Sequence, residues 1–73
     1  MDITTIVKNL IEKGAEIFDL STSNIALKRN EIYMEVDYDD AILTIFRNEI
    51  NLKYPFKLLD EEILNVLLRL VEE

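Results

Sequence analysis

The spacing of the hydrophobic residues changes twice along this 73-residue chain. Near the N-terminus they recur with the 3.6-residue period of a helix. Between residues 24 and 55 they alternate with polar residues, and after residue 60 the helical period returns. A segment with period two predicts strands that bury one face. This order predicts an α+β fold: a two-layer sandwich in which a four-stranded antiparallel meander is flanked in sequence by an N-terminal and a C-terminal helix.

The first helix has one clear start and two candidate ends. Asp2 is a good N-cap, and a hydrophobic stripe follows at Ile3, Ile6, Val7, Leu10 and Ile11. Gly14 is the first candidate end, because glycine readily takes the left-handed conformation that closes a helix. Alternatively, Gly14, Ile17 and Phe18 continue the same stripe. We favour the longer helix, from residue 2 to about 19, followed by a polar loop at residues 21–24.

Two copies of one short motif predict hairpin turns. Arg29-Asn30-Glu31-Ile32 recurs as Arg47-Asn48-Glu49-Ile50, and each copy lies between two alternating segments. Asparagine tolerates the positive φ that a tight turn requires. A third turn is expected at Asp39-Asp40. The resulting strands cover about 24–29, 31–38, 41–47 and 49–55.

These turns fix a register that can be tested by arithmetic. They place Leu27 opposite Met34, Met34 opposite Ile45, and Ile45 opposite Leu52. A slip of one residue would send the aliphatic side chains of one strand to the wrong face. The predicted inner face carries Ile25, Leu27, Ile32, Met34, Val36, Leu43, Ile45, Ile50, Leu52 and Tyr54.

The C-terminal segment predicts a second helix over about 60–72. Asp60 is its expected N-cap, and the stripe that would cover the sheet comprises Ile63, Leu64, Leu67, Leu68 and Val71. Val66 and Leu70 fall outside that stripe. Either the first helix covers them or a second copy of the chain does. We favour a homodimer with Val66 and Leu70 in its interface, because small domains often gain stability by association.

The outer face of the sheet carries an unusual group of side chains. The register places Tyr33 opposite Phe46, with Ile42 nearby and Glu35 and Asp37 beside them. Three interpretations are open: an ordinary solvated sheet face, a self-association face, and a docking face for a basic partner. In the third, the aromatic residues anchor the partner and the carboxylates meet lysine or arginine. These five residues are our candidate partner-binding residues.

The missing residue types exclude many kinds of chemistry. The chain has no Cys and no His, and its one Gly cannot build a phosphate-binding loop. We therefore expect no enzymatic activity and no cofactor. Asp37, Asp39 and Asp40 offer three carboxylates for a metal ion, but their spacing does not match an EF-hand loop.

The net charge of −7 argues against direct binding of nucleic acid. It favours a larger partner protein with a basic surface, although acidity can also serve solubility alone. No hydrophobic run approaches the ~20 residues of a membrane span, and no basic leader opens the sequence. Together with the missing cysteines, this predicts one small domain over residues 1–73 in the cytoplasm.

The leading hypothesis is a small acidic, non-enzymatic protein-binding module, which would act as an inhibitor if it occupies a nucleic-acid-binding surface. The alternative is a homo-oligomeric structural or regulatory subunit. In size, charge and helix–strands–helix order, the chain is similar to small acidic phage-encoded inhibitors, including some anti-CRISPR proteins. That similarity implies mimicry of nucleic acid. It involves no defined motif and assigns no residue a role.

Overall fold

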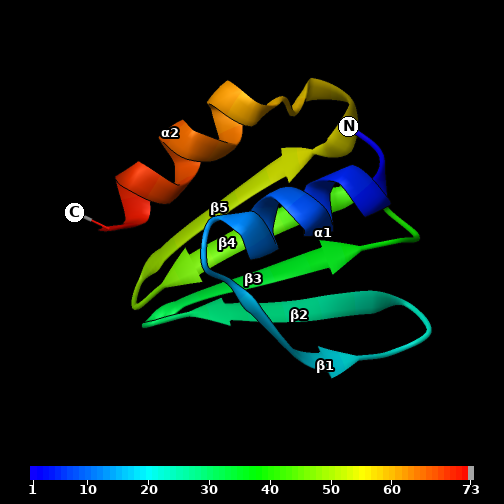
Figure 1. Ribbon diagram of the computed structural model, residues 1–73, viewed down its shortest axis with the longest axis horizontal. Helices are drawn as coiled ribbons and strands as arrows, with labels where there is room; N and C mark the ends of the chain where they lie inside the picture. Colours follow the sequence, from blue (N-terminus) through cyan, green and yellow to red (C-terminus); the bar gives the residue numbers. More distant parts are fainter. Residues whose placement is uncertain (73) are drawn as a thin grey trace.

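The computed structural model describes residues 1–72 and contains two helices that lie on the same face of one antiparallel sheet (Figure 1). The elements follow in the order α1 (Ile3–Glu12), β1 (Glu16–Leu20), β2 (Asn24–Arg29), β3 (Ile32–Asp37), β4 (Ile42–Arg47), β5 (Ile50–Pro55), η1 (Phe56–Leu58) and α2 (Glu61–Glu72). Each strand pairs with the next one in sequence. Neither helix of the described chain is long and apolar enough to cross a bilayer.

The predicted number of strands was wrong, because the first helix is shorter than expected. It ends at Glu12, and Gly14 takes φ +97°. The main-chain nitrogens of Gly14 and Ala15 donate to Ile11 and Leu10, which closes the helix in a Schellman motif. The residues that we assigned to its last turns form β1, so the sheet has five strands instead of four.

The predicted hairpin register is confirmed for all four strands of the original meander. Leu27 pairs with Met34, Met34 with Ile45, and Ile45 with Leu52. The repeated turn motif is confirmed as well, with Asn30 and Asn48 both at φ 55°. The turn between β3 and β4 is longer than the predicted Asp39-Asp40 pair. It spans residues 38–41, and the strands around it are correspondingly shorter.

The core fills the space between the sheet and the two helices. Its fully buried members come from α1, from the three central strands and from α2: Ile6, Leu10, Leu27, Met34, Val36, Leu43, Ile45, Leu64 and Val71. Ile50 was expected among them, but it is 41% exposed because it lies at the end of the edge strand β5. The predicted N-cap of α2 is confirmed, since Asp60 accepts a hydrogen bond from the main-chain nitrogen of Ile63 at 2.8 Å.

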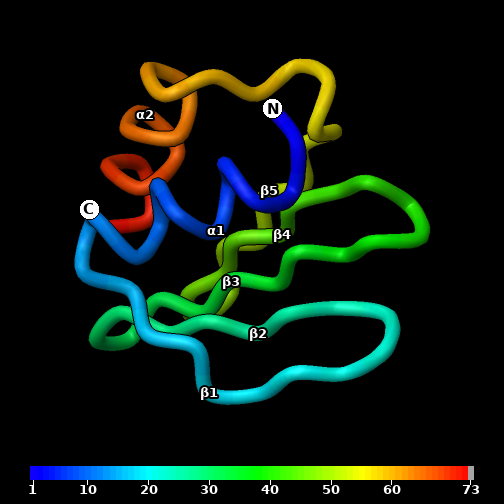
Figure 2. The backbone as a smooth tube through the Cα atoms, turned by 45° about the vertical axis from the view of Figure 1, so that its right-hand side comes forward, coloured from blue at the N-terminus to red at the C-terminus, as the bar shows by residue number. Residues whose placement is uncertain are grey.

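The helices leave part of the inner sheet face uncovered. Figures 1 and 2 both show α1 above the middle of the sheet and α2 towards β5, with β1 beyond the reach of either helix. All five residues of β1 are exposed. The sheet therefore offers two open regions: its whole outer face, and a strip of the inner face beside α1.

Candidate protein-binding surface

The outer face of the sheet is built from three rows of side chains that run across the strands. The first row comprises Glu16, Lys28, Tyr33, Phe46 and Asn51, in strand order. The second comprises Asp19, Ala26, Glu35, Thr44 and Lys53. The third comprises Asn24, Asp37, Ile42 and Pro55. This arrangement brings all five predicted partner-binding residues onto one face, opposite the two helices.

Three aromatic rings from three strands form a continuous cluster on this face. The rings of Tyr33 and Phe46 are stacked, with centroids 5.6 Å apart and an interplanar angle of 13°. Phe18 of β1 meets Tyr33 edge to face at 5.9 Å and 82°. The ammonium group of Lys28 lies 5.3 Å from the centroid of the Tyr33 ring. The aromatic cluster (Phe18, Tyr33 and Phe46) is therefore ordered by contacts between its own rings before any partner arrives.

Phe18 belongs to this face because β1 contains a bulge. The register shifts between Ile17 and Asp19, so Phe18 is an extra residue without a partner on β2. A bulge redirects the side chain of the inserted residue. Phe18 is 56% exposed, more than either half-buried neighbour in the cluster, and is its most accessible member.

Sequence reasoning missed Phe18 because it assigned this residue to the first helix. Gly14 was the available signal: a helix that ends there leaves residues 16–20 too short for a second helix and long enough for a strand. The bulge itself has no comparable sequence signal. The hydrophobic residues of Glu16-Ile17-Phe18-Asp19-Leu20 do not alternate strictly, because one residue is inserted.

Carboxylates share the outer face with the aromatic cluster. Four acidic side chains lie in the three rows, against two lysines: Glu16, Asp19, Glu35 and Asp37, against Lys28 and Lys53. Glu35 is exposed, whereas Asp37 is half-buried and accepts a hydrogen bond from the main-chain nitrogen of Asp40 at 3.0 Å. Over residues 1–72, no three potential ligands come together closely enough to hold a metal ion. The face can therefore offer apolar anchors and negative charge.

The two predicted oligomer-interface residues lie elsewhere. Val66 and Leu70 are 51% and 55% exposed on α2, and α1 does not cover them. They share the helix with a buried stripe that the sequence predicted well, at Leu64, Leu67, Leu68 and Val71. The prediction that α2 carries apolar residues outside its buried stripe is therefore confirmed.

Comparisons of this chain with protein-family models, with curated proteins and with solved structures found no match.

Proposed function

We propose that this protein is a non-catalytic binding module that docks its outer sheet face onto a basic surface of a larger protein. The observation that carries the proposal is the aromatic cluster on a sheet face that also carries four carboxylates. Aromatic rings that are already ordered lose little conformational entropy on binding, and such rings are frequent energetic centres of protein interfaces.

The two kinds of side chain have separate roles in this proposal. Phe18, Tyr33 and Phe46 enter apolar pockets of the partner and hold the complex together. Glu35 and Asp37 attract lysine or arginine and accelerate the encounter. Where the partner's basic surface normally holds DNA or RNA, the module would compete with the nucleic acid and act as an inhibitor. The lack of cysteine suits a reducing compartment such as the cytoplasm.

Affinity capture with paired variants tests this function. Tagged protein is incubated with a bacterial lysate at low and high salt, and the retained proteins are identified by mass spectrometry. We expect a basic protein that wild type retains and Phe46→Ala loses. Glu35→Lys with Asp37→Lys should also lose it, whereas Glu49→Lys with Glu62→Lys, which changes the net charge equally at exposed sites on a turn and on α2, should retain it. Equal retention by all four proteins would refute the proposal.

A second candidate function is supported by the exposed apolar side of α2. In that case Val66 and Leu70 pair with a second copy, and the protein is a homo-oligomeric structural or regulatory subunit. Light scattering at high micromolar concentration separates the two functions. A dimer that Val66→Glu with Leu70→Glu converts to a folded monomer favours the subunit. A monomeric wild type eliminates it.

A further inference from the structure

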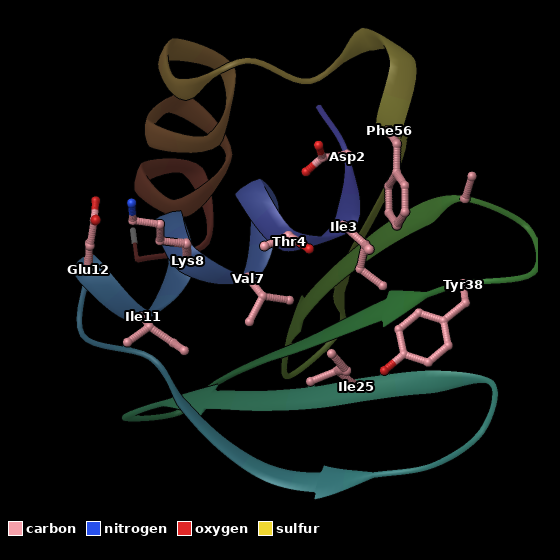
Figure 3. Close-up of a pocket in the computed structure, with 11 residues that line it drawn as sticks. Asp2, Ile3, Thr4, Val7, Lys8, Ile11, Glu12, Ile25, Tyr38 and Phe56 are labelled. Atoms are coloured by element: carbon pink, nitrogen blue, oxygen red, sulfur yellow. The ribbon is translucent and has the colours of Figure 1, made fainter.

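An apolar groove runs between α1 and the uncovered inner strip of the sheet, on the side opposite the aromatic cluster. It has a volume of about 890 Å³ and opens to solvent along one side. Figure 3 shows Ile3, Val7 and Ile11 of α1 along one wall, facing Ile25 of β2 and Tyr38. Phe56 closes one end. The residues of the α1 wall recur every four positions, so they lie along one side of the helix.

The apolar surface extends beyond the groove onto β1. Ile17 and Leu20 pair with Leu27 and Ile25, so they point to the same side of the sheet as the core. Neither helix covers them: Ile17 is 46% exposed and Leu20 66% exposed, and Ile11 across the groove is 48% exposed. Aliphatic side chains from α1, β1 and β2 are therefore exposed or half-buried on this side of the sheet.

The width of this strip corresponds to one missing helix. Neighbouring strands lie about 4.8 Å apart, so the two strand spacings beside α1 span roughly 10 Å. Helices that pack side by side are separated by about 8–10 Å. A third helix would thus lie next to α1 on the same face of the sheet, as α2 does on its other side.

The charged side chains around the groove indicate which charge its ligand should carry. Asp2 and Glu12 line it together with Lys8, and Tyr38 and Ala41, at the same end as Phe56, bound the turn that carries Asp39 and Asp40. Among the lining side chains, two carboxylates stand against one ammonium group, and Asp39 and Asp40 add two more carboxylates on the adjoining turn, which favours a cationic ligand. A second copy of this chain, with its own net charge of −7, matches these carboxylates less well than a cationic partner does.

Strand addition at the edge of β1 is a weaker alternative. An added strand needs a regular row of free main-chain groups, and the bulge at Phe18 interrupts that row. The groove lies on the face of the sheet and does not depend on the edge. We propose that it binds an amphipathic helix of a partner protein, with apolar residues towards α1 and β1–β2 and lysine or arginine along its flanks. This site is independent of the outer sheet face.

A synthetic peptide provides the probe. A helix of about 14 residues, built from Leu on one face and Lys on the other, would span roughly 21 Å, more than the length of the ten-residue helix α1. A second peptide carries Glu in place of Lys. Titration of each into isotopically labelled protein, followed by amide chemical shifts, locates the contact. We expect the Lys peptide to perturb Val7, Ile11 and Ile25, and the Glu peptide to perturb none of them.

Single variants on exposed positions then test the groove without disturbing the core. Ile11→Gln and Leu20→Gln should each lower the affinity for the Lys peptide about fivefold to tenfold, because each removes an aliphatic contact that the bound peptide would bury. Leu70→Gln is the matched control, since Leu70 is similarly exposed on α2, and it should bind as wild type does.

Four results would overturn this proposal. They are perturbations centred on Tyr33 and Phe46, equal binding of both peptides, affinity unchanged in Ile11→Gln and Leu20→Gln, or a dimer in light scattering that Ile11→Gln abolishes. The first would leave the proposed function of the outer face intact. Loss of the lysate partner in Phe46→Ala, with normal peptide binding in the groove, would show that the two sites are separate.

Discussion

Arg47, at the end of β4, donates a hydrogen bond from Nη1 to the main-chain oxygen of Val71 at 3.0 Å, in the last turn of α2. The same nitrogen reaches the main-chain oxygen of Glu72 at 2.8 Å. The equivalent arginine in the other copy of the turn motif, Arg29, donates to the main-chain oxygen of Lys13 at 3.0 Å, at the end of α1. The repeated motif therefore supplies each helix with a cation for its free carbonyl groups.

Replacing Arg47 should destabilise the fold. We expect Arg47→Ala to lower the free energy of unfolding by about 1–2 kcal/mol, because two charge-assisted hydrogen bonds to the end of α2 are lost. Urea denaturation followed by circular dichroism measures this. Arg47→Lys should restore part of the lost free energy of unfolding. Arg69→Ala, at an exposed position on α2, should change the free energy of unfolding little. Equal effects of the changes at positions 47 and 69 would mean that Arg47 does not cap the helix.

The conformation of Gly14 makes it a sensitive position. Its φ of +97° is unfavourable for any residue with a side chain, although an added Cβ would approach nothing closer than Cδ of Arg29, at 3.4 Å. We therefore expect Gly14→Ala to destabilise the protein by about 1 kcal/mol or more through backbone strain. This corresponds to a fall in Tm of roughly 4–8 °C. A stabilised variant would instead indicate that the helix continues through this position.

The stacked pair in the aromatic cluster should show a measurable coupling. A double-mutant cycle of Tyr33→Ala and Phe46→Ala is expected to give an interaction energy of about 0.5–1.5 kcal/mol, since the two rings are in direct contact. Urea denaturation of the four proteins provides the values. Additive effects would show that the rings do not stack in solution.

The N-cap of α1 predicts a specific dependence on pH. The main-chain N–H of Thr5 donates to the Asp2 carboxylate at 2.9 Å, and this hydrogen bond lowers the pKa of Asp2 below its ordinary 3.8. A lowered folded-state pKa means that the ionised form stabilises the helix. That stabilisation is complete above pH 3.8 and is lost as the pH falls through the folded pKa.

Asp2→Asn provides the control, because asparagine caps a helix without titrating. Below pH 3.8 wild type should lose stability relative to Asp2→Asn, and at neutral pH the difference between them should not vary with pH. Urea midpoints measured from pH 2 to neutrality test this. A difference that stays constant at every pH would rule out the carboxylate as the cap.

The parts of the fold that were predictable from sequence depend on neighbouring residues. Alternation and tight turns fixed the pairing of Leu27 with Met34 and of Ile45 with Leu52, because a two-residue turn leaves one register for the strands that it joins. The same reasoning placed Tyr33 next to Phe46 on the outer face. These positions follow from local geometry alone.

The parts that failed depend on competition between distant segments. A helix that continued through Gly14 would have kept Ile17 and Phe18 in its apolar stripe, and nothing local forbids it. Instead, these residues pair with β2, where they add a strand to a sheet that already exists. Tertiary pairing thus outweighed helical periodicity. The groove beside α1 was unpredictable for the same reason, since it exists only because the helix stops early.

The order of the strands has a consequence for synthesis of the protein on the ribosome. Every strand pairs with the one made immediately before it, so the sheet can grow one strand at a time as the chain emerges. At about 5–20 residues per second, these 73 residues take roughly 4–15 s to make, far longer than the microseconds in which a hairpin forms. We expect arrested nascent chains to become resistant to protease only after α2 has emerged, because Leu64 and Val71 complete the core.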